Sequence, residues 1–81
     1  MINKEFIDAV NSMGKPGSTL IHVKRAQWAP RLKCWKIQVQ DRRHGGNWDG
    51  WDIYNDLKRA MTQEKFDELD IQVFGNGVIV Q

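Results

Sequence analysis

Apolar residues recur at helical spacing in two parts of the chain, and each part predicts a helix. The first helix is expected over residues 4–13, with Asn3 as its N-cap. Its apolar stripe consists of Phe6, Ile7, Val10 and Met13. The second helix is expected to begin at Asp49 or Asp52, with an apolar stripe of Ile53, Leu57, Ala60 and Met61. Thr62 then starts either a third short helix or a kinked continuation of the second one.

Four other segments are rich in β-branched and aromatic residues and predict two hairpins. Residues 19–28 and 32–40 are joined through Ala29-Pro30-Arg31, and residues 71–74 and 78–81 flank Gly75-Asn76-Gly77. The Asn-Gly pair supplies the positive φ values that a tight hairpin turn needs. The predicted fold is a single small α+β domain over residues 1–81. It consists of an N-terminal helix, an antiparallel β-hairpin, one or two helices and a C-terminal β-hairpin.

Alternation along the first hairpin separates an apolar face from a polar one. The residues expected to face the core are Ile21, Val23, Trp35, Ile37 and Val39. The polar face would carry His22, Lys24, Ala26, Trp28, Cys34, Lys36, Gln38 and Gln40, unless a bulge shifts the alternation. The pattern therefore predicts a flat surface that is basic and rich in amides.

Charge is divided unevenly between the two halves of the sequence. Residues 15–44 contain eight Lys and Arg but only one Asp, whereas residues 45–81 contain seven Asp and Glu but only three Lys and Arg. Basic residues on ordered β-structure concentrate positive potential on one surface, which points to an acidic partner. The net charge of only +2 leaves two kinds of partner open, nucleic acid and an acidic protein surface.

Basic and aromatic residues interleave in the first hairpin and the loop after it, as contact with phosphates and bases would require. Lysine and arginine would neutralise phosphates while Trp28 or Trp48 stacks on an unpaired base. The candidate binding residues are Lys24, Arg25, Trp28, Arg31, Lys33, Lys36, Arg42, Arg43, His44 and Trp48. The alternative interpretation is a solvated sheet face whose charges protect strand edges from aggregation. Of the neighbouring tryptophans, Trp51 is expected in the core and Trp48 partly exposed.

No spacing in the sequence brings a nucleophile, a general base or a set of metal ligands together. Cys34 and His22 would share the polar hairpin face, but nothing supplies an orienting acid or an oxyanion hole. We therefore expect a non-enzymatic protein with no catalytic residues, metal or cofactor. A lone cysteine rules out an internal disulfide. The lack of a leader and of a long apolar run indicates a cytoplasmic protein that does not enter a membrane.

Two functions fit these observations. The first is a non-enzymatic binding module whose basic hairpin face and Arg/Trp loop dock on nucleic acid. The alternative is a small inhibitor that blocks a host nucleic-acid-processing or defence complex by protein contact, presenting either the basic face or the acidic second half. The size and element order are similar in kind to small phage and mobile-element inhibitors, including anti-CRISPR proteins. A homodimer formed through an exposed strand at residues 78–81 is compatible with both.

Overall fold

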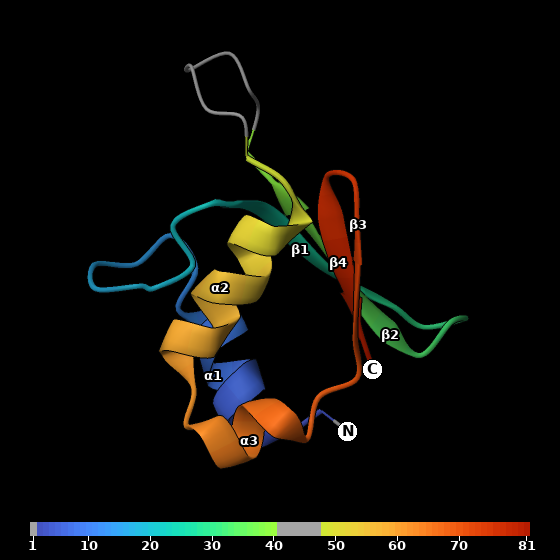
Figure 1. Cartoon of the computed structure of the whole chain (residues 1–81), viewed down its shortest axis with the longest axis horizontal. Helices are drawn as coiled ribbons and strands as arrows, with labels where there is room; N and C mark the ends of the chain where they lie inside the picture. The colour runs from blue at the N-terminus through green and yellow to red at the C-terminus, as the bar shows by residue number, and fades with distance from the viewer. Residues whose placement is uncertain (1, 41–47) are drawn as a thin grey trace.

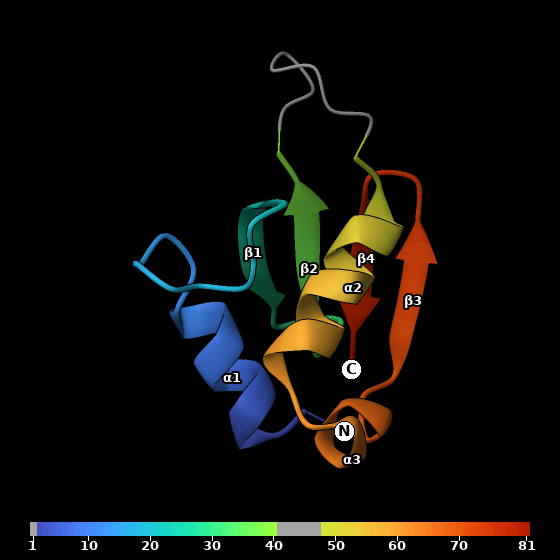
Figure 2. The same ribbon diagram turned by 60° about the vertical axis from the view of Figure 1, so that its left-hand side comes forward.

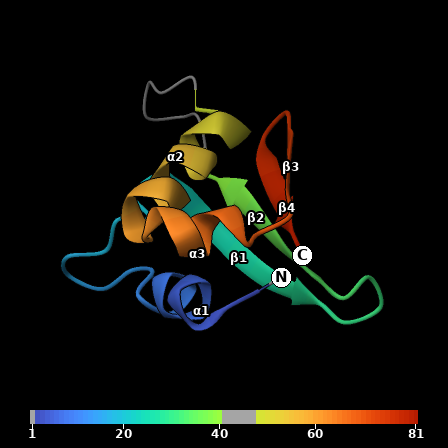
Figure 3. The ribbon, with the colours of Figure 1, turned by 60° about the horizontal axis from the view of Figure 1, so that its bottom comes forward.

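The computed structural model describes residues 2–40 and 48–81. Its helices are α1 (Lys4–Asn11), α2 (Gly50–Ala60) and α3 (Gln63–Asp67), and its strands are β1 (Val23–Ala29), β2 (Cys34–Val39), β3 (Ile71–Phe74) and β4 (Gly77–Val80). The strands form one antiparallel sheet in the order β1-β2-β4-β3. The three helices lie against one face of this sheet, and the described residues leave its other face uncovered (Figure 1 and Figure 3). The predicted small α+β fold is confirmed, and of the two alternatives for the segment after Thr62 the structure has a separate short helix, α3.

Capping side chains set where each helix begins. Asn3, Asp49 and Thr62 each accept a backbone N–H hydrogen bond from the first turn of α1, α2 and α3 respectively. The sequence identified Asn3 and Thr62, and it offered Asp49 as one of two choices. At its other end α1 stops two residues before the predicted Met13, because the chain turns away at Ser12, whose hydroxyl donates to a carbonyl of the last helical turn.

A β-bulge at Lys24 divides the first hairpin into two registers. Val23 pairs with Val39, but the next pair along the strands is Arg25 with Gln38, so Lys24 is an extra residue in β1. The strand also begins at Val23, four residues later than residue 19, where the sequence pattern placed its start. The bulge therefore reverses the alternation for the remainder of β1.

Because of the bulge, Ala26 and Trp28 face the helices and not the uncovered side. Ala26 pairs with Ile37, which is fully buried, and Trp28 pairs with Trp35. The ring centroids of Trp28 and Trp35 are 5.9 Å apart. The expectation that Ala26 and Trp28 lie on the polar face is wrong, and Gln27 takes their place there.

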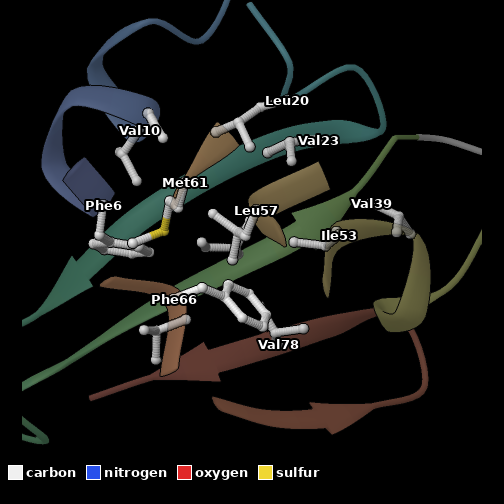
Figure 4. Packing of buried hydrophobic residues seen from close by; sticks show 13 residues of the cluster. Phe6, Val10, Leu20, Val23, Val39, Ile53, Leu57, Met61, Phe66 and Val78 are labelled. Atoms are coloured by element: carbon white, nitrogen blue, oxygen red, sulfur yellow. The ribbon is translucent and has the colours of Figure 1, made fainter. Parts of the chain in front are cut away.

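Side chains from the sheet and from all three helices fill the space between the two layers (Figure 4). The fully or largely buried residues are Phe6, Ala9, Val10, Leu20, Val23, Ile37, Val39, Ile53, Leu57, Met61, Phe66, Val78 and Val80. Ile21, expected among them, is instead 57% exposed, because residues 21 and 22 form a turn before β1 begins. The apolar stripes of α1 and α2 face the core as predicted.

Two neighbouring tryptophans occupy different environments. Trp51, expected in the core, is 58% exposed on the first turn of α2, where its ring meets the ring of Tyr54 edge-on. Each residue turns a helix by about 100°, so Trp51 lies about 200° from the buried Ile53 and cannot share its face. Trp48 is half-buried and packs against the core, which agrees with the expectation that it is partly exposed.

The sheet order places β4 between β2 and β3, so its backbone is paired on both sides. Residues 78–81 therefore offer no free edge, so this strand is not available for the homodimer pairing that the sequence allowed. The two edge strands are β1 and β3. β1 carries the bulge and two charged residues, which protect an edge, whereas β3 has the uncharged sequence Ile-Gln-Val-Phe.

Gly50 provides a test of how tightly α2 packs on the second hairpin. A Cβ atom at this position would lie 2.2 Å from the carbonyl oxygen of Gly77 and 2.8 Å from that of Phe74. Both are backbone atoms that cannot swing away, so we expect Gly50→Ala to destabilise the protein by about 3 kcal/mol. Urea unfolding followed by circular dichroism measures this change.

Gly75 is the matched control, because a Cβ atom there would meet nothing within 4 Å. Gly75→Ala should shift the urea midpoint little. Equal stability of the two variants would mean that the helix and the hairpin do not pack as closely as the structure has them.

Candidate functional site

The uncovered face of the sheet is polar and basic. We call it the open face, and it consists of Arg25, Gln27, Lys36, Gln38, Gln72, Phe74 and Ile79. The pairing aligns these side chains in two rows that cross all four strands, one through Gln27, Lys36, Ile79 and Gln72 and one through Arg25, Gln38, Gly77 and Phe74. Lysine, arginine and glutamine make up three of the four positions in the first row and two of the four in the second, and all of these side chains are exposed. The bulge residue Lys24 is exposed on the edge strand β1.

The charges separate by layer as well as by sequence. The four strands contain Lys24, Arg25 and Lys36 and no aspartate or glutamate. The acidic residues of the described chain lie on the helices and on the turns that join them to the sheet. A flat sheet face without carboxylates attracts polyanions, because no nearby negative charge offsets its lysines and arginines.

The tip of the β1–β2 hairpin extends this basic surface away from the body of the protein. We define the hairpin tip as residues 30–33, all of them exposed, with Arg31 and Lys33 on either side of Leu32. Leu32 is 57% exposed, and Lys33 has a φ of 50°. β4 pairs with β2 only from Trp35 onward, so the hairpin tip reaches past its neighbour, as Figure 1 shows.

Trp28 does not lie on the basic face, where the sequence pattern had placed it beside the lysines. It lies on the helix side of β1, beside Trp35, whose ring centroid is 6.0 Å from that of Phe6. Trp28 remains 42% exposed because it lies near the end of the hairpin, beyond the helices. A base stacked on Trp28 would therefore be on the opposite side of the sheet from Lys36.

No family model, curated protein or solved structure matches this chain. Its function must therefore be inferred from the geometry of its own residues.

The structure describes only part of the loop that contributes to the predicted site. Arg42, Arg43 and His44 lie outside the described residues. Trp48, at the end of that segment, packs its ring edge-on against His22 at a centroid distance of 5.1 Å. Trp48, proposed to stack on an unpaired base, therefore uses part of its ring surface for contact with its own chain.

Sequence reasoning missed the most deeply buried polar group, Asp56. Its carboxylate is fully buried, and it accepts the backbone N–H of His22 at 2.8 Å through Oδ2. The imidazole Nδ1 of His22 lies 2.9 Å from Oδ1, and Arg59 donates to the same oxygen.

A signal for this network was present in the sequence. Asp56 lies between Ile53 and Leu57 on the stripe that faces the core, so a helix over these residues must bury it. A buried carboxylate requires partners, and an arginine three residues later is one that helical spacing supplies. The other partner, His22, is 34 positions away, and no local pattern identifies it.

Few other features of the described residues suggest a ligand. No group of three or more His, Cys, Asp or Glu among them is placed to hold a metal ion. Cys34 is buried at the tip end of β2, whereas His22 precedes the other end of the hairpin, so the two do not meet. No helix in the described part of the chain has the length and apolar character needed to cross a membrane.

We expect Asp56→Ala to destabilise the protein by about 3 kcal/mol, because it leaves the N–H of His22 without its acceptor inside the structure. Urea unfolding measures the loss. Asp67→Ala is the matched control, since Asp67 is exposed on α3 and its removal should change stability by no more than about 0.5 kcal/mol. Similar small effects for both substitutions would contradict a structural role for the buried carboxylate.

Proposed function

We propose that the protein is a non-enzymatic nucleic-acid-binding module that contacts its partner through the open face and the hairpin tip. The observation that carries this proposal is the hairpin from Val23 to Val39, which holds five lysines and arginines and no acidic residue. Arg25 and Lys36 lie on the open face, Lys24 is exposed at the bulge next to Arg25, and Arg31 and Lys33 lie at the tip.

The chemistry of the open face suits a polyanion. Lysine and arginine neutralise phosphates and release their counterions, while glutamine amides donate to phosphate, sugar or base oxygens. A sheet face also presents its charges on one plane, so a nucleic-acid backbone can contact several of them together. The acidic helices lie on the other side of the sheet, which favours one orientation of the bound protein.

The test is binding to fluorescent single-stranded and duplex DNA and RNA, followed by anisotropy at several salt concentrations. The triple variant Lys24→Ala, Arg25→Ala, Lys36→Ala removes three phosphate contacts, so its binding should weaken by roughly tenfold or more. The slope of log affinity against log salt should fall in magnitude by about 2.7.

A second triple variant, Lys4→Ala, Lys58→Ala, Lys65→Ala, controls for total charge. It removes the same number of positive charges, one from each helix, on the acidic layer of the protein. The ion pair of Lys65 with Glu68 is exposed, so its loss should cost little stability. Equal weakening by both variants would show that net charge alone attracts the nucleic acid, and no binding at low salt would overturn the proposal.

A second candidate function is contact with a basic protein segment along the β3 edge. This edge has no charge, proline or bulge to protect it. Exposed Phe74 lies on β3, and exposed Trp51 lies beside Gly50, where α2 packs on the same hairpin. Residues 48–81 carry seven acidic and three basic side chains, so a partner strand rich in lysine or arginine would be favoured.

A pull-down from nuclease-treated lysate separates the two candidates. Under the second candidate a protein remains bound after nuclease treatment and is lost with Trp51→Ser, Phe74→Ser. The Lys24→Ala, Arg25→Ala, Lys36→Ala variant would keep that protein. If the open-face variant loses the same protein, or no protein resists nuclease, the β3 edge is not the contact.

A further inference from the structure

We infer that the hairpin tip enters the major groove of duplex DNA while the open face behind it contacts the flanking phosphates. This inference rests on the proposed function and specifies which nucleic acid the same surface takes. It follows from the shape of the hairpin, from the support beneath it and from the side of the sheet on which the aromatic residues lie.

The hairpin tip is shaped for insertion. Residues 30–33 are exposed and extend past β4, with Arg31 and Lys33 beside Leu32. Figure 3 shows the turn projecting beyond the ends of β1 and β2, away from the three helices. Only two strands, about 5 Å apart, approach the turn. A two-stranded ribbon of this kind fits the B-DNA major groove, which is about 12 Å wide, but not the minor groove at about 6 Å.

Aromatic packing holds the two strands of the hairpin together next to the turn. Trp28 and Trp35 form a cross-strand pair just before the turn, and the ring of Trp35 packs edge-on against Phe6 in the core. Six paired positions from Val23 to Ala29 hold the two strands together. A hairpin fixed in this way can insert without losing much conformational freedom, so little of the binding free energy is spent on ordering it.

The open face lacks aromatic rings beside its basic residues, which proteins that bind single strands use for stacking. Proteins that bind single-stranded nucleic acid place aromatic rings in the same groove as the basic residues, so that bases stack beside bound phosphates. Here Trp28 and Trp35 face the helix side, opposite Arg25 and Lys36. Phe74 is the one aromatic ring of the described strands on the open face, and it lies on β3, at the far edge from β1. Paired bases are already stacked on one another and need no aromatic ring from the protein, so a duplex is favoured over a single strand.

The experiment compares a labelled DNA duplex of about 20 base pairs, its separate strands, and an RNA duplex of the same sequence. The RNA duplex is the informative probe, because it has a similar density of phosphates but a major groove too deep and narrow for the ribbon. We expect the DNA duplex to bind roughly tenfold more tightly than either the RNA duplex or the single strands.

The second arm uses the tip variant Arg31→Gln, Lys33→Asn. Asparagine tolerates the left-handed conformation that Lys33 adopts, so the turn should be retained. Circular dichroism and urea unfolding check that the variant is folded. It should bind the DNA duplex roughly tenfold more weakly and reduce the salt slope by about 2, while its affinity for the RNA duplex changes much less.

The outcomes distinguish the inference from the proposed function. Equal affinity for DNA and RNA duplexes, tighter binding of single strands, or a folded tip variant with unchanged affinity for the DNA duplex would overturn groove insertion. In each of these cases the open-face triple variant would still weaken binding if the proposed function holds. Absence of binding to all probes at low salt would overturn both.

Discussion

The hydrogen bonds that converge on Asp56 fix how the two layers meet. Asp56 lies on α2, the helix that packs against β2, β3 and β4 as well as against the other two helices. Its carboxylate holds the backbone N–H of His22, and the carbonyl of His22 in turn accepts the N–H of Gln40 at 3.0 Å. One residue therefore joins α2, the entry to β1 and the end of β2. A carboxylate buried among apolar side chains is costly unless it is fully paired, so this arrangement does not tolerate a shift of the strand.

The bulge at Lys24 follows from that constraint. At the His22 end, Val23 must lie opposite Val39, whereas from Arg25 to Ala29 the pairing is offset by one residue. The second register is set by the four-residue turn of the hairpin tip and by the pairing of Trp28 with Trp35. A bulge is the means by which an antiparallel pair accommodates two registers that differ by one residue. The same bulge places Arg25 and Gln27 on the open face and turns Trp28 toward the helices.

Most of the fold could be predicted from the sequence because it depends on local patterns. The caps at Asn3, Asp49 and Thr62 and the helical stripes each involve residues close together in the chain. The final hairpin was also predicted, but its turn lies at Gly75-Asn76, and neither Asn76 nor Gly77 has the expected positive φ. The errors have long-range causes. Trp28 was misplaced because the bulge changes the register of β1, and Ile21 was misplaced because residues 21 and 22 form a turn, where His22 bonds Asp56, 34 positions away. Trp51 was misplaced for another reason, since its angle relative to Ile53 already excluded it from the core face.

The sequence predicted that the candidate site is basic, but it did not predict which side chains share a face of the sheet. Lys36 was expected on the polar face and is found there, whereas Arg25 joins it only through the bulge. Period-2 alternation alone would have combined lysines with Trp28 on one surface, which is the composition of a single-strand binder. The bulge instead leaves cations and amides on the open face and turns Trp28 to the helix side, where it packs against Trp35. Under the proposed function, this one inserted residue is what favours a duplex over unpaired bases as the partner of the surface.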